Sequence, residues 1–138
     1  MRQLKAVLSI IVTFVFMLVP TNSISNAATK TLSVHFINVG QGDSIYIKAP
    51  NGEDIIIDGG NKDGSDVVAY LKKQKVKDIE VMIATHPDAD HIGGLDEVLK
   101  AFPVKSVYAP RVGSTTQAYK DFLTAVKNKK LTIKVAKA

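Results

Sequence analysis

Two histidines and two aspartates stand within six residues, directly after an apolar stretch, and no other feature restricts the fold as strongly. They are His86, Asp88, Asp90 and His91, preceded by the apolar residues 81–84 and followed by Gly93 and Gly94. Zinc binds imidazole nitrogen and carboxylate oxygen at about 2.0 to 2.2 Å, so a loop leaving a strand can bring such closely spaced ligands to one point. The glycines let the backbone turn tightly beside an ion. A polar turn with merely solvated side chains is the weaker alternative in this context.

The segment 85–91, which we call the histidine loop, has a spacing that suits two metal ions. His86 and Asp88 would face one ion, and Asp90 and His91 the other, with a bridging water between them. Asp58 ends another apolar run and precedes two glycines, so its carboxylate is expected at the same sheet edge. There it could orient the loop without binding metal itself. Capping of its own turn through backbone amides is the alternative.

The first 27 residues have the composition of a secretory signal peptide. Arg2 and Lys5 give a positive start, and residues 6–20 are almost wholly apolar. This run of 15 residues is shorter than the roughly 20 that span a bilayer, with an uncleaved membrane anchor as the alternative. The sequence therefore predicts a signal peptide over 1–27 and one domain over 28–138. The protein would be secreted and extracellular, with no stable membrane anchor after cleavage.

Composition limits the mature chain to one small domain. Residues 28–138 hold 16 Lys and Arg against 13 Asp and Glu, a bias too weak to predict a nucleic-acid surface, although it permits contact with a polyanion. The chain has no cysteine, which excludes disulfides and a lipid anchor on cysteine. Packing, helped by metal, is expected to supply the stability.

The hydrophobic pattern changes along the mature chain from strands alone to alternating helices and strands. The alternation of Leu32, Val34 and Phe36 with polar residues predicts a first strand on which these three side chains form the buried face. The first three strands should form a small antiparallel sheet, and the whole chain an α/β domain. The expected strands cover 31–39, 44–48, 54–57, 79–84, 104–108 and 131–135, and the expected helices begin at Ser65, Leu95 and Thr116.

Three further features carry weaker signals. The segment 40–44, Gly-Gln-Gly-Asp-Ser, lacks the lysine and helix of a phosphate-binding P-loop, so a tight turn near the active edge is expected. His35 lies opposite the expected buried face and should be a surface or partly packed residue rather than a ligand. Lys127, Lys129 and Lys130 close the last expected helix, where cations complement the helix dipole, with contact to a polyanion as the alternative.

Three motifs, in order, resemble the metallo-β-lactamase fold superfamily. They are Phe-Ile-Asn-Val-Gly-Gln-Gly-Asp-Ser at 36–44, Ile-Ile-Ile-Asp-Gly-Gly at 55–60, and the histidine loop with its trailing glycines. The first motif is similar to the opening strand and turn of ComEC-type competence hydrolase domains. The resemblance covers about 31–138 and corresponds to the N-terminal half of such a domain.

The resemblance implies an αββα sandwich with metals at the edge between two sheets and metal-activated water as the nucleophile. It assigns His86 and Asp88 to the first ion and Asp90 and His91 to the second, and it gives Asp90 the catalytic role of taking the proton of the water. Zinc is the implied metal, two ions per complete domain. Many members have histidine at the position where this chain has Asp88. Because a carboxylate suits a harder metal than an imidazole does, manganese is the alternative. The implied substrate is extracellular DNA or another phosphodiester.

One absence separates this chain from the family pattern. Family members take further ligands from later in the chain, but no histidine follows His91. The expectation is therefore part of a longer secreted hydrolase, of which this chain supplies the first half. The alternative is a truncated, non-catalytic exported binding module that retains the metal loop. A lactamase is the weaker choice among enzymes, because Asp88 and the Gly-Gln-Gly-Asp turn point to the competence subgroup.

Overall fold

The computed structural model describes residues 30–61 and 63–135, and the expected signal peptide over 1–27 lies outside these ranges. Among the helices that the model describes, none has the length and apolar character that a bilayer crossing requires.

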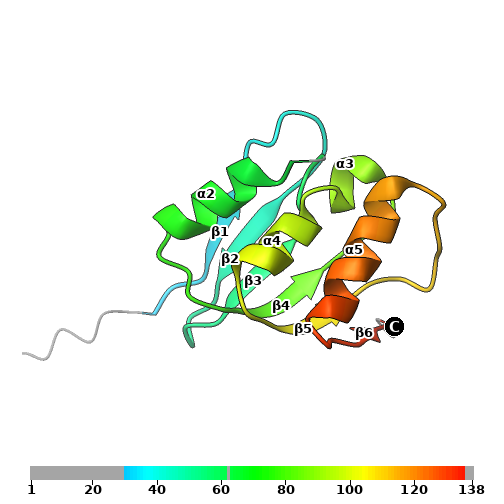
Figure 1. Ribbon diagram of the computed structural model, residues 1–138. Helices are drawn as coiled ribbons and strands as arrows, with labels where there is room; N and C mark the ends of the chain where they lie inside the picture. Colours follow the sequence, from blue (N-terminus) through cyan, green and yellow to red (C-terminus); the bar gives the residue numbers. More distant parts are fainter. Residues whose placement is uncertain (1–29, 62, 136–138) are drawn as a thin grey trace, which may run out of the picture.

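The described strands form one mixed sheet in which spatial order follows chain order (Figure 1). The pairs from β1 to β3 are antiparallel and those from β3 to β6 are parallel. The expected Asn-Gly turn joins β2 to β3, with Gly52 at a φ of 96°. The strands are β1 Ser33–Phe36, β2 Ile45–Lys48, β3 Asp54–Ile57, β4 Ile79–Ile83, β5 Val104–Tyr108 and β6 Ile133–Lys134.

Helices cover one face of this sheet, as Figure 1 shows for α2, α4 and α5. Tyr46, Ile56, Met82 and Val107 are neighbours in register and are at most 2% exposed beneath these helices. The helices contribute fully buried side chains such as Phe122 to the same core. The α/β class is therefore confirmed. The helices are α2 Ser65–Lys73, α3 Ala89–Ile92, α4 Leu95–Ala101 and α5 Gln117–Asn128.

No helix among the described residues covers the other face of the sheet, and this overturns one prediction. Leu32, Val34 and Phe36 are 60%, 46% and 79% exposed, so they do not form the buried face of β1. The covered side of β1 instead carries His35, whose Nδ1 lies 2.8 Å from the Tyr70 hydroxyl of α2. His35 is thus partly packed, as expected. Alternation shows that one face of a strand is apolar, but the placement of the helices decides which face is covered.

Candidate metal centre

The centre lies where two neighbouring parallel strands end. Ile57 and Ile83 are register partners at the ends of β3 and β4, and the Asp58 amide donates to the Ile83 carbonyl at 2.9 Å. Parallel strands point the same way, so the residues that follow them emerge at one edge of the sheet. Asp58 and Thr85 consequently meet there, although 27 residues separate them in sequence.

The Asp58 carboxylate is 2% exposed and binds both ends of the histidine loop. Oδ1 accepts the Thr85 backbone amide at 2.8 Å, and Oδ2 accepts the Thr85 hydroxyl at 2.5 Å. Oδ2 also lies 3.1 Å from Nδ1 of His91. Asp58 has a φ of 56°, a conformation uncommon outside glycine that marks many functional sites. These partners all belong to the loop, so the carboxylate holds the loop against the end of β3.

The two imidazoles of the loop lie in contact at this edge, with their ring planes tilted by 48°. The ring centroids of His86 and His91 are 3.8 Å apart, and Nδ1 of His86 lies 2.9 Å from the Thr85 hydroxyl. One ligand atom each from Asp58, His86 and His91 falls within 4.8 Å of the other two. Two imidazole nitrogens and a carboxylate oxygen are a donor set that fits zinc. The structure therefore offers a candidate metal group at the predicted loop.

The two aspartates of the loop stand apart from this group. Asp88 is the N-cap residue of α3, and its Oδ2 lies 3.7 Å from Nε2 of His86 with the side chain 70% exposed. Asp90 lies in the first turn of α3 and is half-buried. Within the described part of the chain, neither belongs to the close group of possible ligands. Their assignment as metal ligands, and the catalytic role of Asp90, stay predictions.

The turn 40–44 lies against the centre, as the sequence predicted for a tight turn near the active edge. Gly42 has a φ of 99°, and a Cβ atom there would lie 1.7 Å from the Asp90 carbonyl oxygen, so only glycine permits this contact. The Asp43 carbonyl accepts the Gly60 amide at 2.9 Å. Asp43 Oδ2 thereby comes within 3.7 Å of Nδ1 of His91. Asp43 and Thr85 are site residues that sequence reasoning missed.

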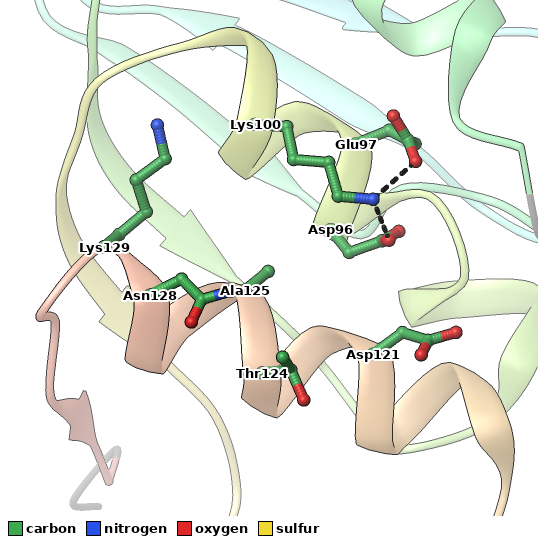
Figure 2. Close-up of a pocket in the computed structure, with 8 residues that line it drawn as sticks. All are labelled: Asp96, Glu97, Lys100, Asp121, Thr124, Ala125, Asn128 and Lys129. Carbon is green, nitrogen blue, oxygen red and sulfur yellow. Dashed lines mark hydrogen bonds and ion pairs between the residues drawn. The ribbon is translucent and has the colours of Figure 1, made fainter.

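A pocket of about 330 Å³, lined largely by charged and polar residues, lies between α4 and α5 (Figure 2). The Lys100 ammonium donates to Asp96 at 2.8 Å and to Glu97 at 2.7 Å, and these hydrogen bonds raise the pKa of Lys100. None of the lining residues comes from the histidine loop. Three of the charged groups of this pocket, Asp96, Glu97 and Lys100, are paired with one another, and we place the candidate site at the loop.

Comparison with known proteins identifies the family. Residues 37–128 match the model of the metallo-beta-lactamase superfamily, a range that includes Asp58 and the whole histidine loop. The chain belongs to the metallo-β-lactamase superfamily. Members of this superfamily are generally hydrolases and usually bind zinc.

Two relatives are competence proteins, as the motif at 36–44 predicted. The chain is 32% identical to "Recombination protein 2" of Haemophilus influenzae, over 69% of this chain and 13% of that protein. It is 30% identical to "ComE operon protein 3" of Bacillus subtilis, over 56% of this chain and 12% of that protein. The chain thus spans only a small part of the length of these relatives.

Solved metallo-β-lactamases are among the structures to which the chain is similar. The enzyme from Hirschia baltica is 17% identical, with a TM-score of 0.43 over 77% of this chain and 48% of its own. The FIM-1 enzyme from Pseudomonas aeruginosa is 18% identical, with a TM-score of 0.40 over 78% of this chain and 45% of its own. The family match over residues 37–128 carries the assignment, and the chain spans about half the length of these solved structures.

Proposed function

We propose that this chain supplies the metal-binding half of a secreted, metal-dependent hydrolase that cleaves phosphodiesters in extracellular nucleic acid. The observation that carries the proposal is the pair of imidazoles, His86 and His91, that the Asp58 carboxylate holds at the ends of β3 and β4. Such a donor set, in a superfamily of hydrolases, is suited to metal-assisted attack by water. Export rests on the composition of residues 1–27.

The two histidines and two aspartates of the histidine loop have proposed roles in a dinuclear centre. His86 and Asp88 would hold one zinc ion, and Asp90 and His91 the other. Bound zinc supplies the means to ionise water near neutral pH. Asp90, on α3, would take the proton of the attacking water, while Asp58 keeps the loop in place through the Thr85 amide. Manganese is the alternative ion, because carboxylate ligands suit harder metals.

The proposed substrate follows from the relatives and is compatible with the charge of the chain. Both relatives are competence proteins, and one is named for recombination, a process that acts on DNA. The excess of basic over acidic residues outside the leader permits approach to a polyanion. A phosphodiester is therefore a better candidate than a lactam.

Substitution of Asp90 tests the proposal directly. The complete hydrolase that contains this chain as its metal-binding half, supplied with Zn²⁺ or Mn²⁺, should cleave a labelled DNA oligonucleotide, and Asp90→Ala should abolish that metal-dependent cleavage. Asp121→Ala is the matched control, because its carboxylate lies on α5, where Gln117 donates to it at 2.7 Å. Cleavage that Asp90→Ala leaves unchanged would remove the hydrolase hypothesis.

A non-catalytic exported binding module is the second candidate. It is favoured by a close ligand group of only three residues within the described ranges. In this case metal would raise the melting temperature of the full chain, because binding to the folded state stabilises it. Hydrolysis would then be undetectable with phosphodiester, lactam and thioester substrates alike.

A further inference from the structure

We propose that Thr85 is a positioning residue, which fixes the tautomer of His86 so that its Nε2 atom is free to bind metal. The inference deepens the proposed function, because it concerns the same metal centre. It rests on two contacts of a single hydroxyl group, one to Asp58 and one to His86.

The direction of these contacts follows from the number of hydrogen atoms. An ionised carboxylate can only accept, and a threonine hydroxyl has one hydrogen to donate. The Thr85 hydroxyl lies 2.5 Å from Oδ2 of Asp58, the shorter of its two contacts, and so donates its hydrogen there. Toward Nδ1 of His86, at 2.9 Å, the same oxygen can offer only a lone pair. The neutral His86 ring must therefore carry its hydrogen on Nδ1, which leaves Nε2 unprotonated.

His91 reaches the same tautomer by a direct route. Its Nδ1 atom lies 3.1 Å from Oδ2 of Asp58, so the carboxylate accepts its hydrogen without a hydroxyl between them. One buried carboxylate thus sets both imidazoles, His91 directly and His86 through Thr85. Without the hydroxyl, His86 would be too far from Asp58 to be held by it, while His91 would keep its partner.

Among the described residues, no other group makes a hydrogen bond to the His86 ring that could fix its tautomer. Its other polar neighbour among the described residues, Oδ2 of Asp88, lies 3.7 Å from Nε2, beyond hydrogen-bond distance, on a side chain that is 70% exposed. The Thr85 amide, bound to Oδ1 of Asp58 at 2.8 Å, fixes the backbone from which the hydroxyl acts. The hydroxyl can therefore be removed while the backbone anchor stays.

Two substitutions separate the hydroxyl from the rest of the side chain. Thr85→Val keeps the shape and removes the hydroxyl, whereas Thr85→Ser keeps the hydroxyl and removes the methyl group. Partners that orient metal-binding histidines commonly change metal affinity 10- to 100-fold. We expect Thr85→Val to weaken Zn²⁺ binding by about that factor, and Thr85→Ser to remain within about twofold of the wild type.

Nitrogen NMR of the metal-free full chain, labelled in the histidine rings, tests the tautomer without any activity. The wild type should show His86 and His91 both protonated on Nδ1. Thr85→Val should turn His86 alone into a tautomer mixture, and Thr85→Ser should restore it. A wild-type His86 protonated on Nε2, or a Thr85→Val spectrum identical to that of the wild type, overturns the inference.

The same experiment distinguishes this inference from the proposed function. If the tautomer of His86 depends on Thr85 but the complete hydrolase that contains this chain cleaves no phosphodiester, the positioning role stands and the hydrolase proposal falls. If Thr85→Val fails to fold, the wild-type spectrum still decides, because the inference requires a proton on Nδ1 of His86. A circular dichroism spectrum of Thr85→Val that matches the wild-type spectrum would verify that any loss of Zn²⁺ affinity is local.

Discussion

Asp54 and Asp58 are buried carboxylates at opposite ends of one strand, and their partners differ in kind. Asp54 begins β3, is 5% exposed, and accepts the Tyr46 hydroxyl at 2.6 Å and the Lys48 ammonium at 2.8 Å. Asp58 follows β3 and binds a hydroxyl, an amide and an imidazole of the histidine loop. A lysine ammonium has no lone pair, whereas an imidazole keeps a second nitrogen for another partner. The first cluster is therefore chemically closed, and the second remains open to a ligand.

The two clusters also differ in how far they reach along the chain. The partners of Asp54 lie eight and six residues away on the adjacent strand β2, within one hairpin. The partners of Asp58 lie 27 and 33 residues away, beyond α2 and β4. A hairpin can form the Asp54 cluster by itself, but the Asp58 cluster requires the parallel pairing of β3 with β4. The candidate metal centre thus depends on the complete tertiary fold.

Asp58→Asn should have the largest effect, because it disturbs both the loop and its histidines. An amide cannot accept every hydrogen bond that the carboxylate accepts, so we expect Zn²⁺ affinity to fall about 10- to 100-fold. The free energy of unfolding should also fall by about 1 to 3 kcal/mol. Calorimetric titration with Zn²⁺ and urea denaturation of the full chain measure the two effects. An unchanged Zn²⁺ affinity would contradict the contrast between the clusters.

Asp54→Asn is the matched substitution at the other end of the strand. It leaves Lys48 without a counter-ion, but the Lys48 side chain is 43% exposed and stays hydrated, which reduces the cost below that of a fully buried pair. We expect the free energy of unfolding to fall by about 1 to 3 kcal/mol, with Zn²⁺ affinity equal to that of the wild type. A parallel loss of Zn²⁺ affinity would show that the two ends of β3 are coupled.

The position of the candidate centre could be predicted from sequence because its signals are local. Ligand-type residues, small loop residues and the apolar runs before Asp58 and the histidine loop all lie within a few positions of one another. Parallel strands then bring their ends to one edge by geometry alone. The register Ile57 to Ile83 is the step that joins the two segments.

The remaining details depend on contacts that no local pattern encodes. Thr85 is an ordinary residue after a strand until the fold places its hydroxyl between Asp58 and His86. Asp43 reaches His91 only because the turn at Gly42 packs against α3. The prediction that the apolar face of β1 is buried is wrong for a related reason. Alternation identifies an apolar face, but it does not reveal which face of the sheet the helices cover. Tertiary packing decides all three.

Tyr46→Phe should have the smallest effect and isolates the closed cluster. Burial, and next the hydrogen bond to Asp54, raise the pKa of Tyr46 well above its usual value of 10.0. Because the folded state keeps this proton longer than the unfolded state, the stabilisation is complete below about pH 10 and declines as the pH rises further. Tyr46→Phe should lower the free energy of unfolding by about 1 kcal/mol at pH 8.

The alkaline dependence supplies the sharper test of that substitution. Above about pH 10 the wild type should lose up to about 1.4 kcal/mol per pH unit through Tyr46, a decline that Tyr46→Phe lacks. Urea denaturation of both proteins between pH 8 and 11 measures the difference, in which titrations common to both cancel. Equal slopes would show that burial and the hydrogen bond to Asp54 do not raise the pKa of Tyr46 in the folded state. The Zn²⁺ affinity of Tyr46→Phe should match that of the wild type, because no atom of this cluster contacts the histidine loop in the described structure.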